Sequence, residues 1–110
     1  MDVSFRENGA YGLITITGRV DATNAPELDS QLDEILIQTN LAVIVDLSGV
    51  EYMSSAGLRS ILKLAKQCQA KKLFLGCCSL QPNVAEVFRI SGFSTIIKLF
   101  DNLESAEQAI

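Results

Sequence analysis

The chain has 110 residues, of which 48% are hydrophobic and 20% charged, and its formal net charge is −4. This length fits one globular domain over residues 1–110. The acidic balance argues against nucleic acid as a partner, because contacts to phosphates require a basic surface. No apolar run approaches the ~20 residues of a membrane span and the start lacks a secretory signal, so we expect a cytoplasmic protein without a membrane partner.

The chain is predicted to begin with a β-hairpin. Apolar and polar residues alternate over residues 3–7, which indicates a short strand. Asn8 and Gly9 then form the strongest short-range hairpin signal. Residues 11–17 are rich in β-branched side chains and predict the second strand.

A loop and a helix are expected next. Residues 18–25 form the loop, and Pro26 fits the first turn of the helix that follows. Within the loop, Asp21 is most simply interpreted as an Asx turn or a cap, and Asn24 as a helix cap. The helix should bury an apolar stripe that consists of Leu28, Leu32, Ile35 and Leu36.

The middle of the chain predicts a buried strand, a turn and a second helix. Residues 41–45 are apolar and β-branched, as in a strand buried on both faces. Asp46 to Gly49 carry turn chemistry. Ser54 and Ser55 come just before a helical pattern whose apolar positions are Leu58, Ile61, Leu62, Ala65 and Cys68.

This arrangement delivers two hydroxyl groups to the start of a helix. The first turn of a helix has unpaired N–H groups and the positive end of the macrodipole. A serine there can cap the helix, accept a phosphoryl group or act as a nucleophile. A cap needs only one of Ser54 and Ser55, and the pattern alone leaves these roles open.

The remaining residues predict two more strands and two more helices. A third parallel strand is expected over 73–77, followed by a helix that has Pro82 in its first turn and ends at Gly92. A short strand over 96–100 and a helix over 102–110 complete the chain. Strands that alternate with helices after an initial hairpin indicate an α/β fold with parallel, right-handed βαβ units.

The composition leaves little scope for catalysis. The chain contains no histidine, which excludes the common Ser-His-Asp and Cys-His nucleophile systems. Its glycines form neither a dinucleotide fingerprint nor a phosphate-binding loop, and its residues have no metal-ligand spacing. The three cysteines are interpreted as reduced, buried residues. We therefore expect no enzymatic activity, no metal and no cofactor.

Residues 46–58 resemble a known signature. They read DLSGVEYMSSAGL, and the pattern D-L-S-x-V-x-x-[MI]-[DS]-S-x-G-L is typical of STAS domains, specifically the anti-sigma factor antagonists of bacterial partner-switching systems. Residues 18–25, GRVDATNA, are similar to a second motif of this family, G-x-[LIV]-D-x-x-[TN]-A. The resemblance covers essentially the whole chain. It implies the STAS fold, with a mixed, mostly parallel sheet whose helices pack mainly against one face.

The resemblance also implies a site and its partners. The serine that the family phosphorylates falls on Ser55, with Ser54 as runner-up at a position where many members have aspartate. The unphosphorylated protein would dock on an anti-sigma factor that is a serine kinase of the ATPase-kinase fold, phosphorylation would end docking, and a protein phosphatase would restore it. ATP and Mg²⁺ would belong to the kinase, and we expect the chain itself to be a monomer. The residues expected at the docking surface are Asp21, Asn24, Ser54, Ala56, Gly57, Leu58 and Arg59.

Two other functions stay open at this point. STAS-like domains also serve as subunits of ABC transporters that move lipids, where the same helix surface docks on an ATPase or permease. A sensor of small ligands is the other alternative.

Overall fold

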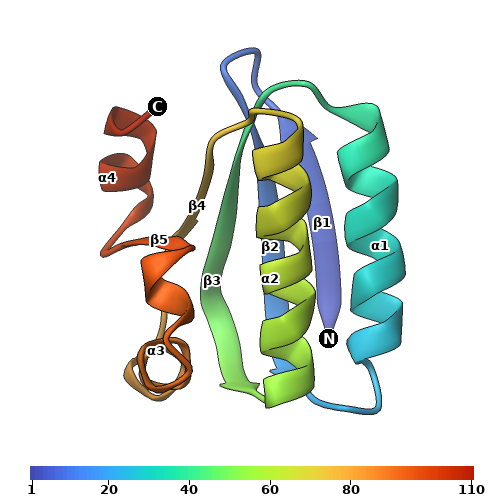
Figure 1. Ribbon diagram of the computed structural model, residues 1–110, viewed down its shortest axis with the longest axis vertical. Helices are drawn as coiled ribbons and strands as arrows, with labels where there is room; N and C mark the ends of the chain where they lie inside the picture. The colour runs from blue at the N-terminus through green and yellow to red at the C-terminus, as the bar shows by residue number, and fades with distance from the viewer.

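The computed structural model describes all residues, 1–110, and shows a hairpin followed by alternating helices and strands (Figure 1). The strands are β1 (Asp2–Glu7), β2 (Tyr11–Val20), β3 (Ala42–Met53), β4 (Leu75–Cys78) and β5 (Lys98–Phe100). The helices are α1 (Ala25–Gln38), α2 (Ser55–Ala70), α3 (Pro82–Ile90) and α4 (Leu103–Gln108), with a 3-10 turn, η1 (Phe93–Thr95), before β5. None of these helices is long and apolar enough to cross a membrane.

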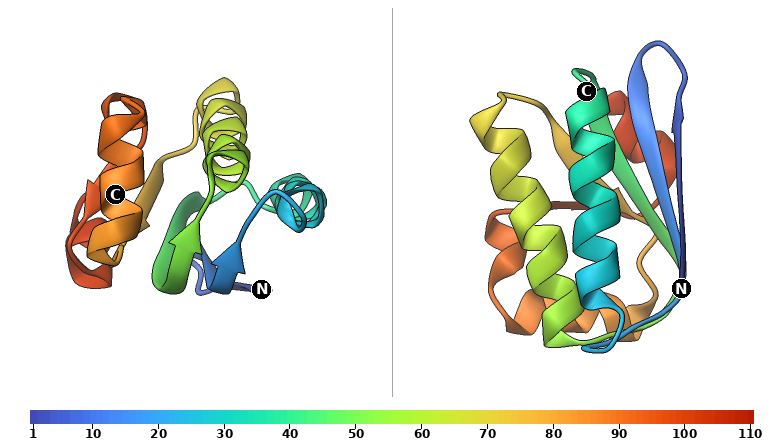
Figure 2. Two further views of the ribbon diagram at one scale, coloured as in Figure 1. Left: turned by 90° about the horizontal axis from the view of Figure 1, so that it is seen from below. Right: turned by 90° about the vertical axis from the view of Figure 1, so that its right-hand side faces the viewer.

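The strands form one sheet in the order β1-β2-β3-β4-β5, antiparallel between β1 and β2 and parallel elsewhere. Because this order never reverses, each right-handed crossover places its helix on the same face, which α1, α2 and α3 cover (Figure 2). Helix α4 follows the last strand and is not a crossover, and it packs against the other face over β3, β4 and β5. The predicted α/β architecture is confirmed.

The sheet has a hydrophobic core on each face. The larger core contains 21 buried residues and includes the whole predicted stripe of α1. The smaller core lies under α4 and consists of Tyr11, Leu13, Ile44, Cys78 and Ala106. Successive side chains of a strand point to opposite faces of the sheet, so Cys77 belongs to the larger core and Cys78 to the smaller one. The Tyr11 hydroxyl also donates a hydrogen bond to the Glu107 carboxylate of α4.

The length of β3 corrects one prediction. Residues 46–49 were expected to form a turn, but the strand continues through them to Met53. The Asp46 carboxylate does accept a hydrogen bond from the Ser48 amide at 2.9 Å, as turn chemistry predicts. Pairing with β2 nevertheless resumes, with an irregular register between the Asp46 and Gly49 positions. These residues therefore form a bulge that bends the strand instead of ending it.

Because β3 is long, its second half extends beyond β4, which pairs only with residues 43–46. The part of β3 that β4 leaves unpaired accepts hydrogen bonds from side-chain amides at the start of α3. Gln81 donates to the Ser48 carbonyl at 3.0 Å and Asn83 to the Glu51 carbonyl at 2.8 Å. The carboxyl end of β3 is therefore held between β2 and α3.

Other boundaries differ from the predictions by a few residues. β2 continues three residues beyond the predicted end, to Val20, because it pairs with the extended part of β3. β5 begins only at Lys98, because the amides of Ile96 and Ile97 both donate to the Phe93 carbonyl of η1 and so continue the turn. The predicted stop at Gly92 is confirmed, since this residue has a φ of 80°, which only glycine adopts freely.

Candidate functional site

The serine pair lies where β3 ends and α2 begins, at the edge of the sheet formed by the carboxyl ends of β2 and β3 (Figure 1). Val20 of β2 is paired with Met53 of β3. The Ser54 amide continues this contact and donates to the Val20 carbonyl at 2.9 Å. The loop that carries the serines is thus held against the end of β2.

The two serines have different roles. Ser54 is the N-cap of α2: its backbone is extended, and its Oγ accepts a hydrogen bond from the Gly57 amide at 3.2 Å. Ser55 is the first residue of the helix, and its side chain is exposed and makes no hydrogen bond within the chain. The capping role therefore belongs to Ser54, which leaves the Ser55 hydroxyl free for chemistry.

The environment of Ser55 suits a phosphate better than a nucleophile. Unpaired N–H groups and the macrodipole at the start of a helix favour a negative charge there. A nucleophilic serine would need a neighbouring base, and the chain has no histidine to supply the usual one. Ser55 therefore combines an exposed hydroxyl with a helix start that favours negative charge.

The loop after β2 lies next to this site and is held by a reciprocal pair of side chains. The Asp21 carboxylate accepts hydrogen bonds from the amides of Thr23 at 2.9 Å and Asn24 at 3.2 Å. The Asn24 side chain accepts from the Asp21 amide at 2.9 Å and donates to the Arg19 carbonyl at 2.9 Å. The two side chains thus bond reciprocally across the turn over residues 21–24, in the pattern of a capping box, while α1 itself begins at Ala25. The predicted Asx turn of Asp21 is confirmed.

Asn24 differs from its predicted capping role. It occupies the N-cap position of α1, but its side chain makes no capping bond to that helix. It reaches back to Asp21 and Arg19 instead, because the turn over residues 21–24 already leads into α1. Asp21 and Asn24 therefore shape the loop beside the serines.

The other predicted contact residues divide between surface and interior. Arg59 is exposed and Ala56 is half-buried. Gly57 and Leu58 are buried, so neither offers a side chain to a partner in this conformation. A Cβ on Gly57 would lie 2.5 Å from Val20 Cγ1, which shows that this glycine lets α2 approach β2 closely. Gly57 and Leu58 therefore pack beneath the surface of the isolated chain, and a contact of either with a partner stays a prediction.

Sequence reasoning missed a second feature of this edge, a pair formed by Arg19 and Tyr52. The Arg19 guanidinium lies 4.4 Å from the centroid of the Tyr52 ring, within cation–π range. Tyr52 is 39% exposed although it is a large aromatic residue. Its place in residues 46–58, close before the serines, was the only signal that could have pointed to it.

A groove of about 360 Å³ lies between the starts of α1 and α2, next to the serine pair. Its walls are formed by Ala22, Ala25, Pro26, Asp29, Ala56, Arg59, Ser60 and Lys63.

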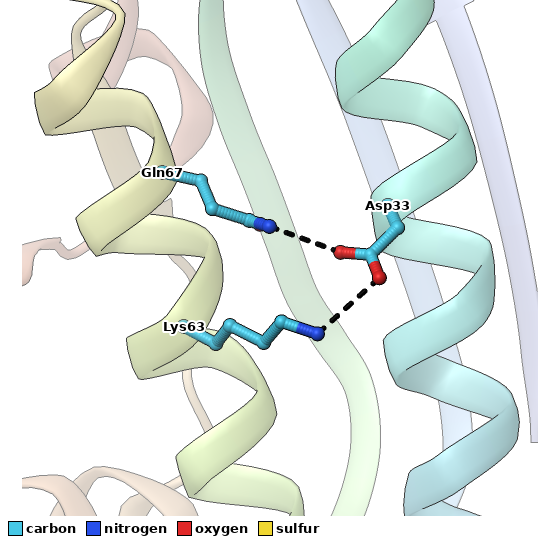
Figure 3. Close-up of polar contacts among 3 residues, drawn as sticks. All are labelled: Asp33, Lys63 and Gln67. Carbon is cyan, nitrogen blue, oxygen red and sulfur yellow. Dashed lines mark hydrogen bonds and ion pairs between the residues drawn. The ribbon is translucent and has the colours of Figure 1, made fainter.

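Lys63 already forms an ion pair, because its ammonium lies 3.2 Å from the Asp33 carboxylate (Figure 3). Gln67 donates to the same carboxylate at 3.1 Å. The hydrogen bonds from Gln67 and Lys63 lower the pKa of Asp33. Of the two cations that line the groove, only Arg59 forms no ion pair.

The cysteines lie away from this site and are buried. Burial raises the pKa of the Cys68 thiol to about 11, so the thiol stays protonated at neutral pH. Burial raises the pKa of Cys77 further. Protonated, buried thiols are poor nucleophiles, and these residues serve as small apolar core residues.

Comparisons with known proteins agree on one family. The family model of the STAS domain matches residues 2–106. BtrV of Bordetella bronchiseptica, which its name places among anti-sigma factor antagonists, is 38% identical over 86% of this chain and 81% of its own length. The anti-sigma-B factor antagonist of Listeria monocytogenes is 28% identical over 78% of this chain and 75% of its own. These relatives are named as regulatory binding proteins and not as enzymes.

Solved structures share the fold at lower identity. An anti-sigma factor antagonist from Mycobacterium paratuberculosis superposes with a TM-score of 0.85 at 20% identity, over 99% of this chain and 92% of its own. SpoIIAA in its unphosphorylated form superposes with a TM-score of 0.79 at 15% identity, over 98% of this chain and 96% of its own. The phosphorylated form of SpoIIAA, from Bacillus, superposes with a TM-score of 0.73 at 14% identity, over 99% and 100%.

Proposed function

Because this chain belongs to the STAS domain family, we propose that it is an anti-sigma factor antagonist controlled by phosphorylation. The unphosphorylated chain docks through the surface around Ser55 on an anti-sigma factor that is also a serine kinase of the ATPase-kinase fold. Phosphorylation of Ser55 by this kinase ends docking, and a protein phosphatase restores it. ATP and Mg²⁺ are bound by the kinase.

The observation that carries this proposal is the free hydroxyl of Ser55. A kinase needs a serine whose side chain it can reach, and Ser55 is exposed and bonded to nothing in the chain. Ser54 is half-buried and its oxygen already accepts a hydrogen bond, which makes it the weaker candidate. The names of the relatives support the regulatory role, and SpoIIAA is itself known in unphosphorylated and phosphorylated forms.

The position of Ser55 also indicates how the switch works. A phosphate adds about −1.5 to −2 charges at neutral pH. The start of α2 tolerates this charge, so the fold of the chain is preserved. In the complex, the phosphate is covered by the partner and loses its water, and this cost falls on binding. The phosphate therefore acts at the interface.

Mapping the phosphate tests the proposal. The chain is incubated with ATP and each ATPase-fold anti-sigma factor kinase of the same genome, and the modified residue is located by mass spectrometry. We expect one of these kinases to modify Ser55. A phosphate found only on Ser54 or Ser48 would overturn the site, and the absence of both modification and binding with every kinase would overturn the function.

A further inference from the structure

We propose that Asp29 is a specificity-determining residue of the docking surface and that its carboxylate receives one basic side chain of the anti-sigma factor. This inference rests on the proposed function and names the chemistry that the partner must bring to it. It concerns the groove between α1 and α2, which lies outside the serine loop itself.

The groove is continuous with the surface around Ser55. Asp29 lies in the second turn of α1 and forms one wall, while Ala56 and Arg59 of α2 form the other. Ala56 directly follows Ser55 in the chain. A protein that covers Ser55 therefore also covers the mouth of this groove.

Asp29 has an unsatisfied oxygen. Its Oδ1 is shielded from solvent and has no hydrogen-bond partner. Shielded polar atoms are almost always bonded, because the loss of water without a replacement costs free energy. Asp33, one turn further along α1, shows the usual arrangement: Gln67 bonds one of its oxygens and Lys63 the other (Figure 3). The two carboxylates share a helix face, and only Asp29 lacks a partner for this atom.

The chain offers no cation to Asp29. Its two ion pairs join Lys63 to Asp33 and Arg89 to Glu86. Arg59 lines the same groove but forms no ion pair. Much of the remaining wall is small and uncharged, with Ala22, Ala25 and Ala56 among its residues. Asp29 as a whole is partly exposed, so a side chain from outside can pair with its carboxylate once Asp29 turns the shielded Oδ1 toward the groove.

The missing partner is best supplied as a basic side chain. A neutral donor would satisfy the oxygen but leave the charge uncompensated, whereas a guanidinium or ammonium group does both. The carboxylate has already lost part of its water, so pairing costs less further desolvation than at a fully hydrated surface carboxylate.

Matched charge removals on α1 test this inference. Binding of Asp29→Asn and Glu34→Gln is compared with wild type by isothermal titration, using the anti-sigma factor kinase that binds the wild-type chain. Glu34 is exposed, does not line the groove and lies about 140° around the helix from Asp29, so its variant removes the same charge elsewhere. We expect Asp29→Asn to weaken binding about thirty-fold or more and Glu34→Gln to change it less than about two-fold.

Two further measurements separate contact from folding. Asp29→Asn should melt at the wild-type temperature or above, because Oδ1 has no bond to lose. Asp29→Glu, which keeps the charge, should retain most of the affinity. Wild-type affinity in Asp29→Asn, equal losses in Asp29→Asn and Glu34→Gln, or a loss in Asp29→Asn that tracks a lower melting temperature would overturn the inference while the proposed function stands. A wild-type chain that binds no such kinase would overturn the proposed function instead.

Discussion

The Oγ atom of Ser54 accepts a hydrogen bond from the amide of Gly57 at 3.2 Å, and this contact gives two adjacent serines different roles. A helix start needs one capping side chain, and Ser54 supplies it. Ser55 is therefore not required by the fold, and its exposed hydroxyl is available to another protein. Under the proposed function, this division places a stabilising serine and a regulatory serine at neighbouring positions.

This division can be measured by replacing each serine with alanine. Ser54→Ala removes the cap of α2 and should cost about 1 kcal/mol of unfolding free energy. In a domain of this size the loss corresponds to about 4 °C in melting temperature. Ser55→Ala removes no bond and should melt close to wild type. Thermal unfolding of both variants checks the assignment, and a larger loss in Ser55→Ala than in Ser54→Ala would reverse it.

A negative charge at residue 55 should weaken docking without unfolding the chain. We expect Ser55→Asp to keep the wild-type circular dichroism spectrum, because the start of α2 accepts the charge. In the complex, an unpaired charge costs roughly 3–4 kcal/mol, which corresponds to a few hundred-fold in affinity. Ser55→Ala is the control and should bind normally while resisting phosphorylation. If Ser55→Asp binds the kinase as tightly as wild type, the charge mechanism is wrong.

Gly57 should tolerate no side chain. A Cβ there would lie 2.5 Å from Val20 Cγ1 and 3.3 Å from Met53 Cγ, so α2 would have to move away from the ends of β2 and β3. We expect Gly57→Ala to cost about 1–3 kcal/mol, the usual range for overpacking. Chemical unfolding measures this loss. A wild-type midpoint in Gly57→Ala would show that the close approach of α2 to Val20 does not constrain this residue.

Tyr52 should contribute to docking more than to folding. Its ring is partly exposed beside the serine loop, where the Arg19 guanidinium covers it, and tyrosine and arginine are enriched among the residues that dominate interfaces. Tyr52→Ala is expected to weaken binding to the kinase about ten-fold or more with little change in melting temperature. Ile90→Ala is a matched control, since Ile90 is 78% exposed on α3. Similar affinities in both variants would remove Tyr52 from the docking surface.

The buried thiol of Cys68 should make stability fall at alkaline pH. Burial raises its pKa from 9.0 to about 11, so between these values the unfolded chain has lost a proton that the folded chain keeps. Unfolding then releases up to one proton, and the stabilisation that is complete below pH 9 is lost as pH rises toward 11, by at most about 1.4 kcal/mol per pH unit. Urea unfolding at several pH values should show a shallower decline in Cys68→Ala than in wild type. Parallel curves would contradict the role of this thiol.

Much of the fold was predictable because its signals are local. The Asn8-Gly9 hairpin, the apolar stripe of α1, the first-turn position of Pro82 and the stop at Gly92 each depend on residues near one another in the chain. Strands that alternate with helices after a hairpin predicted a mixed, mostly parallel sheet, whereas the order of the strands within the sheet came from the tertiary structure. The position of two serines at the start of α2 was predictable for the same reason.

The sequence by itself determined the elements, their order and the presence of hydroxyl groups at a helix start. Only the tertiary structure decided that Ser54 is the cap, that β3 continues through its bulge, that Gly57 lies against Val20, and that Asp29 has an oxygen without a partner. Each of these facts depends on backbone geometry or on segments far apart in the sequence that meet across the sheet or between helices. Periodicity and capping residues report the local preference of a segment, whereas the neighbours that it meets are set by packing of the whole chain.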